Sequence, residues 1–164
     1  ASDVYKRQLS VSEGGSVITL DQVETRDNLR VVSDIGSRLP IYCTSQGKVF
    51  LAHMSRTSAE ALLRAQHMTQ FTPHTITDLT ALMQEIDLCR TDGYAIENGE
   101  YKIGLRSISA PVYTVEGKAR YTVGVIGMFR STRSDEFLAA VEQVCAAASM
   151  ISTALGYRKT EELL

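Results

Sequence analysis

The spacing of apolar residues changes along this chain, and these changes constrain its fold more than any other feature. Alternating patterns rich in β-branched residues are typical of strands, whereas apolar residues three and four apart are typical of helices. The predicted strands cover residues 9–12, 16–23, 29–32, 104–114 and 119–129. The predicted helices cover residues 44–54, 58–65, 77–90 and 134–155. We therefore expect one α+β domain in which helices pack on an antiparallel sheet.

Individual residues indicate where several of these elements begin and end. Gly14-Gly15 suits the tight turn of a hairpin. Residues 36–40 are predicted to be a loop, because the proline at its end forces the preceding residue out of helical geometry. Thr44 or Ser45 can cap the first helix and Ser58 the second. Gly93 stands where a helix is expected to stop.

The first eight residues, ASDVYKRQ, show no clear period. We interpret residues 1–8 as a cloning scar or foreign extension and leave them out of the fold. The domain is then expected to cover residues 9–164.

Charge and composition exclude several classes of function. The chain has 17 Lys and Arg against 19 Asp and Glu, and the basic residues are scattered among acidic ones. A nucleic-acid-binding surface usually needs a basic excess on one face, so direct DNA binding is not expected. No nucleotide-binding or hydrolase motif is present, and the histidines lack paired-ligand spacing. We expect no metal, no cofactor and no catalytic residue.

The cysteines and the hydropathy pattern bear on location. Three cysteines stand far apart and fit neither a disulfide framework nor a zinc site: Cys43, Cys89 and Cys145. No signal peptide opens the chain, and no apolar run approaches the roughly 20 residues that span a bilayer. We expect a soluble cytoplasmic protein with no membrane contact.

A series of short motifs between Gly36 and Gly156 points to a family. In chain order these are Gly36-Ser-Arg-Leu-Pro40, Gly47-Lys48, Phe71-Thr-Pro-His-Thr-Ile-Thr-Asp78, Gly93-Tyr94-Ala95, Gly104-Leu105 with Ile108-Ser-Ala-Pro111, Gly117, and Ile151-Ser-Thr-Ala-Leu-Gly156. Their order and spacing resemble the effector-binding domain of transcriptional regulators of the isocitrate-lyase-regulator (IclR) family.

This resemblance implies a fold and a function. The fold would be GAF/PAS-like, a curved antiparallel sheet of about six strands flanked by helices. The function would be to bind a small organic-acid effector and so control, allosterically, an N-terminal winged helix-turn-helix that this sequence does not contain. DNA would then be bound only through that absent domain. A homodimer or homotetramer is expected, and the chain is not expected to be an enzyme.

The best physical argument for a ligand site lies at Thr44-Ser45-Gln46-Gly47. A helix beginning here presents unpaired backbone N–H groups and the positive end of its dipole, which together hold a carboxylate. Gly47 would let an anion approach the backbone. From the residues alone, the favoured interpretation is that Ser45 merely caps the helix. The resemblance implies that Ser45 and Gln46 bind the effector's carboxylate.

The resemblance also implies further site residues. Glu97 and Ser107 keep the family's polar ligands, whereas Gly124 and Ile126 replace two hydroxyl-bearing residues by a void and a branched alkyl group. We therefore predict an acid larger or more apolar than glyoxylate or pyruvate: branched, aromatic or sugar-derived. The apolar wall would be formed by Val31, Leu39 and Leu105. Gln46 either adds an amide contact or narrows the pocket.

Two alternatives remain open. Cys43 lies just before a helix start, which lowers a thiol's pKa, so a GAF-type thiol reductase is one of them. A domain that only mediates oligomerisation is the other. If the chain is a sensor, the segment 97–102 and the Ser45 helix start are the expected moving parts.

Overall fold

The computed structural model describes residues 4–24 and 34–160. A six-stranded antiparallel sheet has the strand order β3-β2-β1-β6-β5-β4. Its strands are β1 (Val4–Glu13), β2 (Ser16–Glu24), β3 (Arg38–Pro40), β4 (Ala95–Asn98), β5 (Arg106–Tyr113) and β6 (Ala119–Gly127). The helices are α1 (Ser45–Ala52), α2 (Arg56–Arg64), α3 (Leu79–Asp92) and α4 (Asp135–Ala154). The curved sheet with flanking helices confirms the expected α+β fold.

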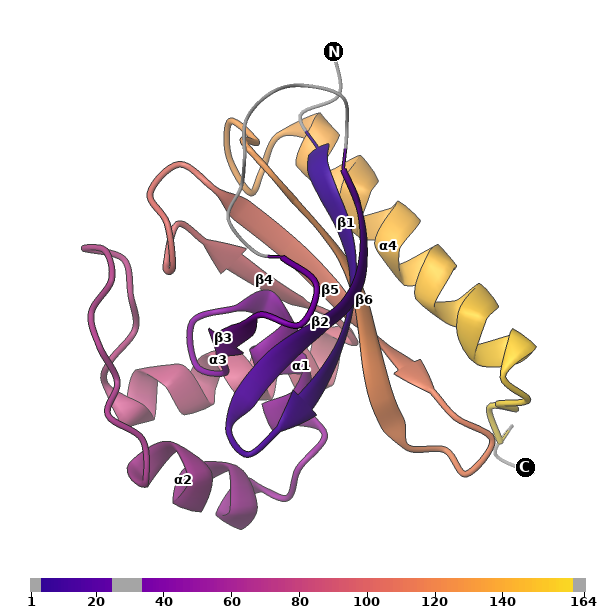
Figure 1. Ribbon diagram of the computed structural model, residues 1–164, viewed down its shortest axis with the longest axis horizontal. Helices are drawn as coiled ribbons and strands as arrows, with labels where there is room; N and C mark the ends of the chain where they lie inside the picture. The colour runs from indigo at the N-terminus through magenta and orange to yellow at the C-terminus, as the bar shows by residue number, and fades with distance from the viewer. Residues whose placement is uncertain (1–3, 25–33, 161–164) are drawn as a thin grey trace.

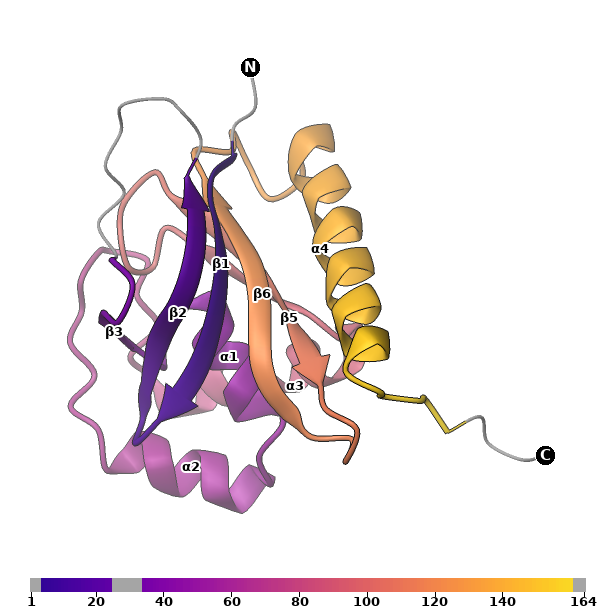
Figure 2. The same ribbon diagram turned by 45° about the vertical axis from the view of Figure 1, so that its right-hand side comes forward.

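The sheet separates two layers of helices. α4 runs along one face, where it contacts β5 and β6, while α1 and α3 lie on the other (Figures 1 and 2). Each layer has its own hydrophobic core. Val49, Leu51 and Ile86 are fully buried in the α1–α3 layer, and Ile108 and Val112 are fully buried beneath α4. α1 is buried at every position, so its polar residues face the interior of the domain.

β1 is longer than the sequence indicated. It begins at Val4, and residues 6–8 pair with both β2 and β6. Leaving residues 4–8 out of the fold was therefore wrong, because they belong to a strand inside the sheet. Their apolar residues show no clear alternation, since the inward-facing positions are the polar Lys6 and Gln8, both buried.

Three other boundaries differ from the predictions. Residues 38–40, expected in a loop, form β3 and pair with β2, because the extended backbone before proline also suits an edge strand. Ser55 rather than Ser58 caps α2, since its side chain accepts from the N–H of Ser58. β4, which was not predicted, pairs with β5. The predicted strand 29–32 lies outside the described residues.

α4 begins and ends close to prediction, with Ser134 as its N-cap. Its buried side follows Phe137, Val144 and Ala148, whereas the apolar residues Leu138 and Ile151 are exposed. By length and composition alone α4 could cross a bilayer, which corrects the expectation that no segment reaches that length. This is weak evidence for a membrane span, because helices of soluble cores can meet the same criterion.

Candidate functional site

The start of α1 is built by residues on either side of it. Thr44 is the N-cap: its hydroxyl accepts from the N–H of Gly47 at 3.2 Å and donates to the Pro40 carbonyl at 2.8 Å. Because Thr44 caps the helix, Ser45 is its first residue and its hydroxyl contacts the sheet instead. The structure thus decides between the two caps that the sequence left open.

Gly47 permits a close approach of α1 to the chain before it. A Cβ atom at this position would lie 1.9 Å from the Ile41 carbonyl oxygen. Gly47 is therefore required by the packing of α1 against residue 41, a reason different from the close approach of an anion that the sequence suggested.

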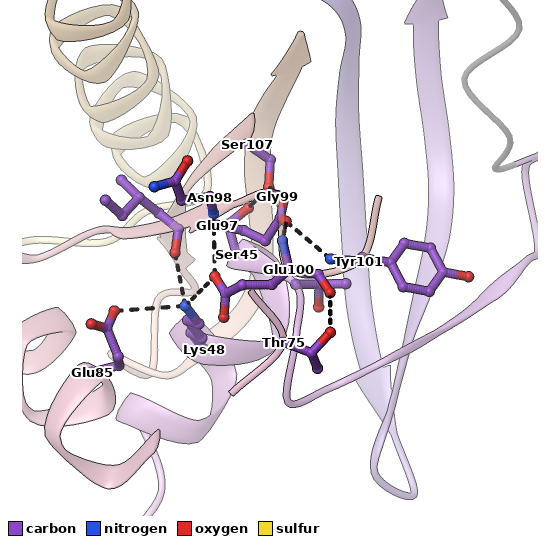
Figure 3. Close-up of polar contacts among 12 residues, drawn as sticks. Ser45, Lys48, Thr75, Glu85, Glu97, Asn98, Gly99, Glu100, Tyr101 and Ser107 are labelled. Carbon is purple, nitrogen blue, oxygen red and sulfur yellow. Dashed lines mark hydrogen bonds and ion pairs between the residues drawn. The ribbon is translucent and has the colours of Figure 1, made fainter. Parts of the chain in front are cut away.

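The hydroxyls of Ser45 and Ser107 meet the carboxyl group of Glu97 beneath the start of α1 (Figure 3). Ser107 on β5 donates to Ser45 at 2.8 Å and can also donate to Glu97 Oε2 at 3.2 Å. Ser45 shares a further 2.8 Å hydrogen bond with Ser109. We call Ser45, Glu97, Ser107 and Ser109 the hydroxyl–carboxyl cluster. All four are buried.

Glu97 is only 3% exposed. Its Oε1 atom accepts backbone hydrogen bonds from Glu100 and Tyr101 (Figure 3). Burial raises the pKa of its carboxyl group to about 7, and the backbone N–H of Tyr101 opposes the shift without cancelling it. Glu97 can therefore change its protonation state near neutral pH.

A buried ion pair lies next to this cluster. Lys48, one turn after Ser45 on α1, is 1% exposed, and its Nζ atom is 2.8 Å from Glu100 Oε2 and 3.1 Å from the Ile96 carbonyl oxygen. Glu85 on α3 approaches the same nitrogen at 3.6 Å (Figure 3). Lys48 thus ties α1 to the segment that carries Glu97.

A small cavity of about 30 Å³ opens beside the cluster. It is lined by Gln8, Leu39, Thr44, Gln46, Glu97, Tyr101, Lys102, Leu105, Ser107 and Ile126. Gln46 donates from Nε2 to Gln8 Oε1 at 3.0 Å, and its Oε1 lies 3.4 Å from the Ser45 hydroxyl. The volume has room for roughly one or two water molecules, and the Gln46 amide forms part of the cavity wall.

The structure brings most of the predicted site residues together. Leu39, Gln46, Glu97, Leu105, Ser107 and Ile126 line the cavity, and Ser45 bonds to its wall. Gly124 does not line it, and Val31 lies outside the described residues. The sequence analysis missed Gln8, Thr44, Tyr101 and Lys102. Gln8 was in the segment set aside, and nothing in the sequence marks it as a contact of Gln46.

Gly124 leaves no void. A Cβ atom built there would lie 2.4 Å from both the Ile108 carbonyl oxygen and the Ser109 hydroxyl. Gly124 pairs with Ser109 across β5 and β6, so the Ser109 side chain occupies the neighbouring space on this face. The predicted void was wrong, because the sequence alone could not show which partner strand residue fills it.

We expect Gly124→Ser to lower the free energy of unfolding by about 1–3 kcal/mol, as overpacking of a close-packed interior usually does. Urea unfolding followed by circular dichroism would measure it. Gly124→Ser combined with Ser109→Gly should recover part of the loss, because the second change vacates the contested space. A single variant as stable as wild type would show that the site does hold free volume.

A larger cavity lies elsewhere. A groove of about 420 Å³ separates α4 from β1 and β6, with Leu9, Val125 and Ile151 among its apolar lining residues. It contains none of the hydroxyl–carboxyl cluster. Small polar ligands are oriented by a few converging polar groups, so we place the candidate site at the smaller cavity.

Cys43 does not have the environment of a reactive thiol. It is fully buried, and burial raises the pKa of its thiol to about 12, with the nearby Glu100 and Glu97 carboxylates adding to the shift. The neutral thiol is a poor nucleophile. The thiol-reductase alternative therefore loses the lowered pKa on which it rested. Among residues 4–24 and 34–160, no cluster of His, Cys, Asp or Glu could hold a metal ion.

Comparison with known proteins identifies the family of this chain. The family model described as the bacterial transcriptional regulator IclR C-terminal domain matches residues 6–153. The HTH-type transcriptional repressor AllR of Escherichia coli K12 is 27% identical over 150 residues, covering 92% of this chain and 55% of its own length. The chain thus spans about half the length of this relative.

Solved structures show the same fold. The Agobacterium tumefaciens repressor BlcR superposes with a TM-score of 0.86 at 28% identity, over 96% of this chain and 62% of that one. An IclR homologue from Microbacterium hydrocarbonoxydans, solved with 4-hydroxybenzoate, superposes with a TM-score of 0.82 at 24% identity. The match covers 92% of this chain and 60% of that one. The named curated relative is a transcriptional regulator, in agreement with a non-enzymatic role. The chain belongs to the IclR family of bacterial transcriptional regulators and corresponds to the C-terminal effector-binding domain of such a regulator.

Proposed function

We propose that this domain senses a small organic acid and thereby controls DNA binding by a helix-turn-helix region of the whole regulator. The observation that carries the proposal is the hydroxyl–carboxyl cluster at the start of α1. It places hydroxyl donors, a titratable carboxyl group and a helix N-terminus around one cavity. Such convergence is typical of a site for a compact polar ligand.

Each part of the site has a role in this proposal. The first backbone N–H groups of α1, at Ser45 and Gln46, bind the effector's carboxylate, because they have no partner within the helix and the dipole favours an anion. Glu97 and Ser107 hydrogen-bond its other polar groups. Leu39, Leu105 and Ile126 pack against its carbon skeleton.

The small volume of the cavity suggests how binding changes the domain. Any acid larger than a few atoms must displace the Gln46 amide or move the segment 97–102 that carries Glu97, Tyr101 and Lys102. A ligand shifts a conformational equilibrium only by its differential affinity for the two states. We call the conformation with the Gln46 amide displaced or the segment 97–102 moved the open state. The effector would favour this open state, and we propose that a cytoplasmic homodimer or homotetramer transmits the change to DNA.

The effector class is also part of the proposal. Ile126 in the cavity supports an acid larger or more apolar than glyoxylate or pyruvate. The Microbacterium homologue was solved with 4-hydroxybenzoate, an aromatic carboxylate. Its likeness to this chain is one of fold, so it illustrates the chemistry that such a fold accommodates.

A thermal-shift screen against organic acids tests the function, because a ligand that binds the folded state raises the melting temperature. We expect one class of acid to raise it and Ser107→Ala to abolish most of the shift. Ser149→Ala, on the exposed side of α4, is the matched control and should keep it. A screen without any shift would favour the domain that only mediates oligomerisation.

A further inference from the structure

Three hydroxyl groups are buried side by side on the sheet without a hydrogen-bond partner. Ser10 on β1 pairs in register with Thr19 on β2 and with Thr122 on β6. All three residues are 0% exposed. Within the part of the chain that the structure describes, none of their side-chain oxygens has a partner. Buried hydroxyls are normally satisfied, so three adjacent exceptions require an explanation.

These hydroxyls lie on the same face as the candidate site. The β1–β6 register is regular from Lys6 to Ser10, and side chains two apart on a strand point to the same face. Ser10 therefore lies about 7 Å beyond Gln8 along β1, and its partner Thr122 lies at the same distance from Gly124 along β6. We call Ser10, Thr19 and Thr122 the hydroxyl triplet.

A buried amide contact lies next to the triplet. Gln46 reaches from α1 to Gln8 on β1, and both residues are nearly fully buried. Both also line the small cavity, and the triplet begins two residues further along β1 at Ser10. The inner face of the sheet thus carries an almost continuous polar strip from Glu97 to Thr19.

We propose that the effector is a polyhydroxylated carboxylic acid whose hydroxyl-bearing chain displaces the Gln46–Gln8 contact and reaches the hydroxyl triplet. The inference rests on the proposed function, since it takes the carboxylate to bind at the start of α1. It names one class among the acids that the site could take.

The chemistry of the strip favours this class. A serine or threonine hydroxyl donates one hydrogen bond and accepts two, and it therefore matches hydroxyl groups on a ligand. An apolar chain would leave the triplet unsatisfied, and a site built to bind hydroxyls rejects analogues that lack them. The triplet itself contains no charged residue to bind a second ionic group.

Isothermal titration of the full chain with matched acids tests the proposal. Gluconate has the hydroxylated chain, hexanoate has the same carbon number without hydroxyls, glycolate is short, and glucose lacks the carboxylate. We expect gluconate to bind most tightly and glucose not to bind. Thr122→Val should weaken gluconate binding about fivefold, the loss of one hydrogen bond, and leave glycolate binding unchanged.

The variant is chosen so that a folding defect cannot be mistaken for the result. Replacing an unsatisfied buried hydroxyl by a methyl group of the same shape should leave the melting temperature equal or higher. Thr80→Val, at an exposed position of α3, is the control and should bind gluconate as wild type does.

The possible results distinguish a failure of this inference from a failure of the proposed function. If gluconate binds no more tightly than hexanoate or glycolate, or if Thr122→Val leaves its affinity unchanged, the polyhydroxylated class is wrong. Binding of any acid that is lost in Ser107→Ala would still support an organic-acid sensor. If none of these acids binds, this inference fails, and the thermal-shift screen against other classes of organic acid decides the proposed function.

Discussion

Lys48→Met is expected to lower the free energy of unfolding by about 3–5 kcal/mol, as removal of one partner from a buried ion pair does. The substitution keeps the length of the side chain but leaves the Glu100 carboxylate buried without its cation. Glu100 is 4% exposed; among the described residues its Oε1 atom has no partner, and its Oε2 atom would keep the backbone N–H of Asn98. The Ile96 carbonyl oxygen loses its contact with Nζ as well.

Thermal unfolding provides the measurement. For a domain of this size the melting temperature should fall by roughly 6–20 °C, at about 2–4 °C per kcal/mol. Lys118→Met, at an exposed turn, is the matched control and should change little. The double variant Lys48→Met/Glu100→Gln should recover part of the loss, because residue 100 then carries no charge that needs the lysine as its partner. A single variant within about 1 kcal/mol of wild type would show that Lys48 does not hold α1 in place.

The ion pair and the candidate site share the same two segments. Ser45 and Lys48 lie one turn apart on α1, and Glu97 on β4 is three residues before Glu100. A ligand that moves either segment therefore acts on both the hydroxyl–carboxyl cluster and the Lys48–Glu100 contact. This physical connection is a route by which occupancy of a small cavity could change the position of a whole helix.

The fold could be predicted where local chemistry decided it. Ser134 caps α4 and Gly93 ends α3 with a positive φ of 80°, and both positions follow from the residue types alone. β3 and β4 could not be predicted in this way, because they are three and four residues long. Pairing with a neighbouring strand, which the sequence does not show, is what makes them strands.

The site was predicted in part, from the resemblance rather than from local chemistry. The resemblance implied Glu97 and Ser107, and the structure places them in hydrogen-bond contact. Gln8 could not be found in this way, because its role depends on β1 lying next to β6 and beneath Gln46. Gly124 was misjudged because only the register with Ser109 shows what fills the adjoining space.

The buried carboxyl group of Glu97 should make stability depend on pH. Burial raises its pKa from 4.5 to about 7 in the folded state. Below pH 4.5 the group is protonated in both states and burial carries no charge penalty. As the pH rises from 4.5 to about 7, the unfolded chain ionises first, so the stability contributed by this residue falls. The full shift corresponds to about 3 kcal/mol.

Glu97→Gln isolates this contribution. The amide oxygen can still accept from the backbone N–H groups of Glu100 and Tyr101, but the side chain cannot ionise. We expect the variant to match wild type near pH 4.5 and to be more stable by about 3 kcal/mol at pH 8. Urea unfolding at a series of pH values measures the difference in free energy of unfolding between the variant and wild type. The other titrating groups are the same in both proteins, so their contributions cancel in this difference. A difference that does not change between pH 4.5 and pH 8 would mean that Glu97 titrates as an exposed carboxylate does, and that the site is open to water.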